Sequence, residues 1–152
     1  KQFLYQVEWN NLDFLVIDLP PGTGDAQISL SQSVPISGAI VVTTPQKVSL
    51  QDARRGLAMF KQLDVPLLGV VENMSVFIPP DMPNKKYEIF GKGGGKILAG
   101  ENNLPLLAQI PIEIKLVNDS NKGVPISISE PDKESSIRFK ELAQLIKKQF
   151  IN

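Results

Sequence analysis

Four short apolar runs recur along the chain, and turn residues follow each of them. They are residues 14–18 (FLVID), 39–44 (AIVVTT), 66–73 (PLLGVVEN) and 105–111 (PLLAQIP). Each run is apolar at successive rather than alternate positions, which is typical of strands covered on both faces. Because helical or loop segments separate the runs, the pattern predicts an α/β fold with a mostly parallel sheet and helices on both faces.

Two segments have the apolar spacing of covering helices. Residues 49–63 are expected to form a helix with Ser49 as its N-cap. The apolar stripe of this helix is Leu50, Ala53, Leu57 and Phe60. Residues 131–150 carry acids near the start and lysines near the end, as the helix dipole favours. The stripe of this second helix is Ile137 or Phe139, Leu142, Leu145, Ile146 and Phe150.

The terminal helix could cover the sheet or lie on a membrane surface. Its basic residues are few and are balanced by acids, which favours the covering role. Residues 75–95 and 118–132 are expected to be irregular, and long irregular segments in compact domains are usually functional or mobile.

Composition narrows the chemistry that the chain can perform. The 152 residues contain neither Cys nor His, which excludes disulfides, thiolate metal sites and imidazole catalysis within this chain. Sixteen basic residues balance sixteen acidic ones, which argues against nucleic acid or an anionic membrane as the partner. No apolar run reaches the length of a membrane span. We therefore expect a soluble protein of the cytoplasm, with an organelle stroma as the alternative.

The strongest chemical signal is FLVIDLPPGTGD, residues 14–25. Asp18 ends a predicted strand at the sheet edge where open α/β sheets bind ligands. A carboxylate there needs a cation or hydrogen bonds, and Mg²⁺ carrying nucleotide phosphates is a common solution. Gly22 and Gly24 would let the backbone approach a terminal phosphate. The alternative is a capping aspartate followed by a rigid turn.

The glycine-rich stretch FGKGGGK, residues 90–96, does not match a phosphate-binding loop. In the pattern G-x-x-x-x-G-K-[ST], Phe90 would stand in place of the first glycine and Ile97 in place of the hydroxyl residue. The stretch is instead predicted to be a flexible lead into a short helix.

Several motifs together resemble one family. VIDLPPGTGDAQISLSQSVP, GAIVVTTPQKVSLQDARRGLAMFKQLDVPLLGVVENMS, FGKGGGKILA and QIPIE are similar to the latter half of the Mrp-type P-loop ATPases. These are iron–sulfur cluster carriers related to septum-placing and chromosome-partition ATPases. The resemblance implies that residues 1–152 form the C-terminal portion of a single P-loop NTPase domain. Because the chain opens with Lys1 rather than Met and without a domain-opening signal, we expect that residues upstream have been lost.

The resemblance also implies roles for individual residues. Asp18 resembles the Walker B aspartate, which holds Mg²⁺. Residues 20–25, with Pro21, Gly22 and Thr23, resemble the switch loop that senses the terminal phosphate of ATP. Asn73 resembles the asparagine that recognises adenine, and an Asn amide can pair bidentately with that base; otherwise it is a turn-forming residue. The family's base pocket is walled by a segment that Pro111, Ile112 and Glu113 resemble. The alternative is a plain turn at the end of a strand.

The chain departs from the family pattern in two ways. The family's phosphate-binding loop is missing from these residues, so the chain alone is not expected to hydrolyse ATP. Pro79 and Met82 stand where the family has a Cys-x-x-Cys pair for an iron–sulfur cluster, and neither supplies a thiolate. The apolar segment around them is predicted to pack against a second copy of the chain, the alternative being a flap over its own domain.

The resemblance therefore implies that the chain is part of an ATP-binding, ATP-hydrolysing, Mrp-like homodimer that delivers iron–sulfur clusters to apoproteins. One alternative is an ATPase switch of the septum-placing or partition type. Another is a non-enzymatic scaffold that dimerises and holds a partner.

Overall fold

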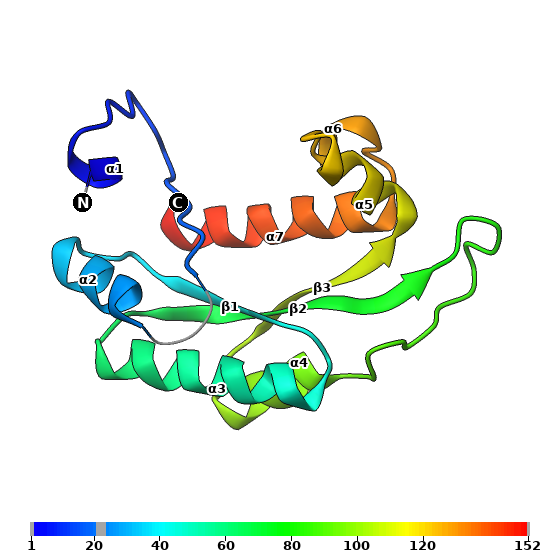
Figure 1. Ribbon diagram of the computed structural model, residues 1–152, viewed down its shortest axis with the longest axis horizontal. Coiled ribbons are helices and arrows are strands. Elements are labelled where there is room, and N and C mark those ends of the chain that lie inside the picture. Colours follow the sequence, from blue (N-terminus) through cyan, green and yellow to red (C-terminus); the bar gives the residue numbers. More distant parts are fainter. Residues whose placement is uncertain (1, 21–23, 152) are drawn as a thin grey trace.

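A computed structural model describes residues 2–20 and 24–151 of the chain. Its centre is a parallel sheet with the strand order β1 (Ala39–Thr43), β2 (Leu67–Ile78) and β3 (Leu106–Glu113). Helices α3 (Lys47–Gln62) and α4 (Gly94–Glu101) cover one face, and α7 (Glu134–Phe150) covers the other (Figure 1). The predicted α/β fold with helices on both faces of a parallel sheet is confirmed.

The other described helices come before β1 or after β3 in the chain. Helices α1 (Gln2–Tyr5) and α2 (Asp25–Ser33) precede β1, and α5 (Ile114–Asn121) and α6 (Ile126–Ser129) lie between β3 and α7. No helix in the described part of the chain is long and apolar enough to cross a membrane.

Two apolar clusters hold the layers together. The cluster under α3 and α4 contains Val41, Leu50, Ala53, Leu57, Val70, Leu98 and Ala99. The cluster on the opposite face contains Val71, Leu107, Ala108 and Ile110, and α7 packs Leu142 and Ile146 against it. Because the neighbours Val70 and Val71 join different clusters, β2 must be apolar at successive positions. Of the expected α7 stripe, Ile137, Phe139, Leu145 and Phe150 remain 40–44% exposed.

The predicted strand at residues 14–18 is wrong. These residues form an extended segment outside the sheet, and Val16 is 90% exposed. Phe14 packs edge-on against Phe150 of α7, with the ring centroids 6.1 Å apart. A strand needs a neighbour for its backbone hydrogen bonds, and within the described residues the sheet consists of β1, β2 and β3, none of which pairs with residues 14–18.

Several predicted boundaries also need correction. Within residues 118–132, predicted to be irregular, α5 continues to Asn121 and α6 follows; Gly123, with φ of 71°, provides the left-handed residue that ends α5. The other irregular segment shortens to residues 79–93, because β2 extends to Ile78. Helix α3 begins at Lys47, so Ser49 lies inside it, where its hydroxyl accepts a hydrogen bond from Thr44 Oγ1 at 2.8 Å.

Candidate nucleotide site

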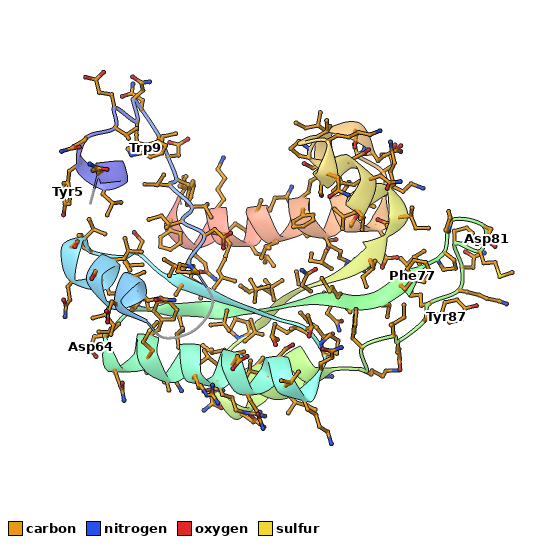
Figure 2. All side chains as sticks on the ribbon, viewed as in Figure 1. Tyr5, Trp9, Asp64, Phe77, Asp81 and Tyr87 are labelled. Atoms are coloured by element: carbon orange, nitrogen blue, oxygen red, sulfur yellow. The ribbon has the colours of Figure 1, made fainter. Side chains whose placement is uncertain are left out.

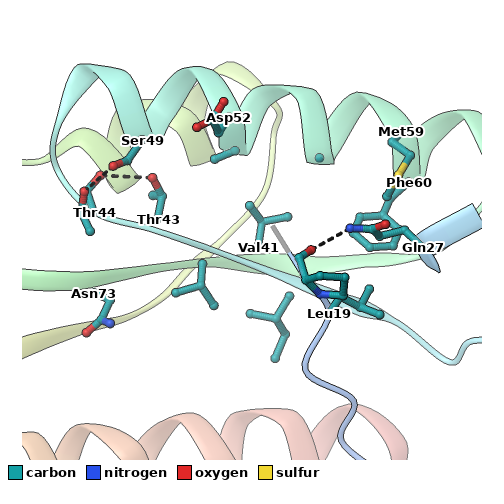
Figure 3. Close-up of a pocket in the computed structure, with 15 residues that line it drawn as sticks. Leu19, Gln27, Val41, Thr43, Thr44, Ser49, Asp52, Met59, Phe60 and Asn73 are labelled. Carbon is teal, nitrogen blue, oxygen red and sulfur yellow. Dashed lines mark hydrogen bonds between the residues drawn. The ribbon is translucent and has the colours of Figure 1, made fainter. Parts of the chain in front are cut away.

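A cavity along the open side of β1 is lined by two residues from the predicted site, Pro20 and Asn73. Its volume is about 360 Å³, and it runs along β1 between that strand, α3 and the segment that precedes α2, from Ile40 and Phe60 at one end to Thr44 at the carboxyl end of the strand. It is lined by Leu19 and Pro20, by Thr43 and Thr44 at the end of β1, and by Asn73 of β2 (Figure 3). Thr43, Thr44 and Asn73 are brought together by the parallel direction of β1 and β2, whereas Leu19 and Pro20, more than 50 positions before Asn73, reach the cavity on a segment outside the sheet.

The segment before α2 is anchored next to this cavity. Gln27 of α2 is 3% exposed, and its amide Nε2 donates a hydrogen bond of 2.7 Å to the Pro20 carbonyl (Figure 3). Gly24 is the N-cap residue of α2. The predicted switch residues Pro21, Gly22 and Thr23 lie between these anchors and outside the described residues.

Asp18 is an exposed carboxylate two residues before Pro20. It lines a separate, mostly apolar groove with Leu15, Ile17 and Leu30. In the described part of the chain, no group of three or more Asp, Glu, His or Cys side chains could hold a metal ion. Mg²⁺ in phosphate sites often takes one or two protein carboxylates and completes its shell with phosphate oxygens and water. Asp18 therefore fits a metal that arrives with a nucleotide, rather than one held by protein ligands alone.

Asn73 lies within β2 rather than at the end of the strand, where it was predicted. The pairing of β2 with β3 shifts its register directly after Asn73, and Met74 adopts a left-handed conformation with φ of 55°. Asn73 Oδ1 accepts a hydrogen bond of 2.9 Å from the Met74 amide. This bond orients the side-chain amide, whose nitrogen donates no hydrogen bond within the described residues.

The segment formed by Pro111, Ile112 and Glu113 ends β3 and does not line this cavity. Pro111 is fully buried, Ile112 is half-buried, and Glu113 is 8% exposed. Glu113 Oε2 accepts hydrogen bonds from the hydroxyl and, at 3.1 Å, from the backbone amide of Ser135. Glu113 therefore holds the first turn of α7 against the end of β3.

The glycine-rich stretch begins α4 and binds a carboxylate of the protein itself. The amide of Gly95 donates a hydrogen bond of 2.6 Å to Oε2 of Glu72, which is 1% exposed. Sequence reasoning missed Glu72, because an acid in the middle of an apolar strand gives no sign of its partner. Two features of the sequence could have indicated a role for Glu72: its position next to Asn73, and a glycine run that does not match the phosphate-loop pattern.

The two positions that align with the family's cysteines lie on one turn. The Met82 amide donates a hydrogen bond of 3.2 Å to the Pro79 carbonyl; Pro79 is buried, whereas Met82 is 44% exposed. Phe77 and Tyr87 form an antiparallel bridge at the base of this loop, and Figure 2 places Asp81 at its outer end. The segment thus projects beyond the carboxyl end of β2.

Comparison with known proteins identifies the family. The chain matches the family described as NUBPL iron-transfer P-loop NTPase (ParA) over residues 1–147. It is 56% identical over 146 residues to the iron-sulfur cluster carrier protein of Synechocystis sp., covering 96% of this chain and 41% of that protein. It is 48% identical over 142 residues to an iron-sulfur protein required for NADH dehydrogenase, mitochondrial, from Arabidopsis thaliana, covering 93% of this chain and 45% of that protein.

Solved structures agree with this result. A nucleotide-binding protein from Archaeoglobus fulgidus, in complex with ADP, is 34% identical and superimposes with a TM-score of 0.73, covering 88% of this chain and 54% of that chain. The cell division ATPase MinD of Pyrococcus furiosus, 24% identical, has a TM-score of 0.68 over 90% of this chain and 52% of that chain, and shows the same fold. The chain spans less than half the length of the two curated relatives, and it belongs to the NUBPL family of iron-transfer P-loop NTPases, in agreement with the Mrp-type resemblance.

Proposed function

We propose that this chain supplies the metal-holding, switch and base-recognition parts of an ATP site in an iron–sulfur cluster carrier. The observation that carries the proposal is the cavity along β1 that Pro20, Thr44 and Asn73 all line. The similarity to a nucleotide-binding protein that was solved with ADP supports the choice of ligand.

Each residue has a distinct task in this proposal. The Asp18 carboxylate holds Mg²⁺, directly or through water, and the metal would neutralise charge on the phosphates of the nucleotide. The loop of Pro21, Gly22 and Thr23 follows Asp18, and the Gly22 amide is the donor that addresses the terminal phosphate. Asn73 pairs with adenine through its amide. The backbone of Pro111, Ile112 and Glu113 closes the base pocket in the nucleotide-bound protein.

Turnover needs more than these residues. Positioning and electrostatic stabilisation account for most of the catalysis in phosphoryl transfer, and a phosphate-binding loop supplies much of both. We propose that this loop belongs to the part of the intact protein that the chain does not span. Two copies would form the active carrier.

The cargo is an iron–sulfur cluster, to be passed to apoproteins. The name of the Synechocystis relative, at 56% identity, supports this choice. Since these 152 residues contain no cysteine, any thiolate ligands must lie outside them.

One experiment on the intact protein tests both parts of the proposal. Wild type and Asp18→Asn are reconstituted anaerobically with iron and sulfide, and iron content and Mg²⁺-dependent ATP hydrolysis are measured. We expect Asp18→Asn to retain iron and to lose hydrolysis by at least about 100-fold, since it removes the charge that holds the metal. The control is Asp64→Asn, at an exposed turn with φ of 53° that Asn tolerates.

Hydrolysis and iron content test different parts of the proposal, so each part can be refuted on its own. Unchanged hydrolysis by Asp18→Asn would refute the assignment of Asp18. Wild-type protein that hydrolyses ATP but takes up no iron would refute the cargo, and would favour an ATPase switch instead.

A further inference from the structure

Glu72 is a buried carboxylate that has no assigned role in the proposed nucleotide site. It is 1% exposed, and both of its oxygens accept short hydrogen bonds. Oε2 accepts from the Gly95 amide at 2.6 Å, and Oε1 accepts from Gln109 Nε2 at 2.6 Å. A buried carboxylate is tolerated only when such bonds replace the water that it loses.

Glu72 fixes the sheet immediately before the point where its pairing breaks. Glu72 is opposite Gln109 in the β2–β3 pairing, and Asn73 is opposite Ile110. The next paired residue of β2 is Phe77, opposite Ile112, so β2 contains extra residues in between. The side-chain bond from Gln109 to Glu72 therefore ties the two strands together one residue before Asn73.

Glu72 also seats the first turn of α4. A Cβ atom on Gly95 would lie 2.7 Å from Glu72 Cβ, so the helix backbone lies directly on this side chain. Helix α4 is preceded by residues 79–93, the segment that projects beyond β2. The carboxylate thus connects three parts of the fold: β3, the end of the projecting segment, and the strand position next to Asn73.

We infer that Glu72 is a positioning residue for base recognition, which sets the place of Asn73 by tying β2 to Gln109 and to the start of α4. The inference rests on the proposed function of Asn73. Glu72 itself does not contact the base. It holds the strand so that the Asn73 amide, oriented by the Met74 amide, presents its donor and acceptor to adenine.

Nucleotide selectivity distinguishes positioning from a purely structural role. Dissociation constants of ATP and GTP are measured for the intact protein and for Glu72→Ala. We expect the preference for ATP over GTP to fall by about tenfold or more, because a displaced Asn73 no longer makes its bidentate pair with adenine. Equal weakening of both nucleotides would mean that Glu72 only stabilises the fold, and would overturn the inference.

Two further variants distinguish a loss of positioning from a loss of folding in Glu72→Ala. Gln109→Ala removes one partner of Glu72 at an exposed position, and is expected to reduce selectivity in the same direction but by a smaller factor. In the exchange Glu72→Gln with Gln109→Glu, the glutamine introduced at position 72 can accept from the Gly95 amide and donate to the carboxylate introduced at position 109. This double variant is expected to restore selectivity, and failure to do so would count against positioning.

Amide hydrogen exchange without nucleotide separates this inference from the proposed function. Glu72→Ala is expected to speed exchange at residues 73–76 as well as at the first turn of α4. Faster exchange in α4 alone would overturn the positioning of Asn73. A different result is that Glu72→Ala speeds exchange at residues 73–76 while the wild-type protein binds ATP and GTP equally well. That result would refute adenine recognition by Asn73 but would support the positioning of Asn73 by Glu72.

Discussion

The position of α4 depends on two glycines at its start, Gly94 and Gly95, which have no side chain. A Cβ on Gly94 would lie 2.6 Å from the Pro45 carbonyl oxygen, and one on Gly95 would lie 2.7 Å from Glu72 Cβ. Both distances are too short for real atoms, so only glycine permits this approach. The stretch that looks like a phosphate cradle therefore holds the helix close to β2 and to the turn after β1.

Replacement of Gly95 tests this close packing. We expect Gly95→Ala to lower the free energy of unfolding by about 1–3 kcal/mol, because the new methyl group forces α4 away from Glu72. Gly100→Ala is the matched control in the same helix: a Cβ there meets nothing within 4 Å. It should raise stability by up to ~1 kcal/mol through helix propensity. Urea unfolding of the three proteins measures the difference, and equal stability of both variants would contradict the packing role.

At the scale of elements, the α5–α6 pair is held by a buried acid. Asp119 of α5 is 3% exposed. One of its oxygens accepts a hydrogen bond of 2.5 Å from the Ser129 hydroxyl of α6, and the other accepts one of 3.1 Å from Lys115. The Ser129 hydrogen bond, followed by the one from Lys115 and its charge, lowers the pKa of Asp119 below its ordinary value of 3.8.

The lowered pKa predicts how the stability of the protein depends on pH. A carboxyl group whose pKa is lower in the folded than in the unfolded state stabilises the fold fully above its ordinary pKa, and this stabilisation disappears as the pH falls through the lowered value. Ser129→Ala removes the largest cause of the shift. We therefore expect a smaller loss of stability below pH 3.8 in this variant than in wild type.

Urea unfolding at neutral pH and in steps below pH 4 measures this effect. Ser127→Ala makes the same chemical change within α6 and should keep the acid sensitivity of wild type. Identical pH profiles for Ser129→Ala and wild type would show that the hydrogen bond to Asp119 does not link α5 and α6.

The sequence predicts an element correctly when residues close together in the chain determine that element, and fails when distant residues determine it. Three of the four apolar runs form strands, because a continuous apolar run needs only cover on both faces, which α3, α4 and α7 supply. The run at residues 14–18 has the same local pattern but lacks a pairing strand. Similarly, the α5–α6 pair depends on Asp119 reaching Ser129 ten residues away, which no short-range pattern reveals.

At the scale of the whole molecule, the parallel sheet edge explains what could be predicted of the site. Thr44 and Asn73 line one cavity because β1 and β2 run parallel, whereas Pro20 reaches it on a segment outside the sheet that Gln27 anchors. Glu113, predicted to be near the base, instead binds Ser135 at the start of α7, a contact that depends on how the terminal helix crosses the sheet. Such contacts between distant segments become visible only in the folded chain.

The projecting segment at residues 79–93 leads to the final prediction, which concerns association of two copies. Met82, Tyr87 and Ile89 are 44–59% exposed there, and we propose that a second copy covers them. Met82→Asp in the intact protein should raise the dimer dissociation constant by about tenfold or more, because a buried unpaired charge costs well over ~1.4 kcal/mol. Leu145→Asp is the control, since Leu145 is also 44% exposed but belongs to the C-terminal half of α7. That end of the helix lies away from the projecting segment (Figure 1). Sedimentation equilibrium with and without ATP measures both variants, and equal dissociation constants would place the dimer contact elsewhere.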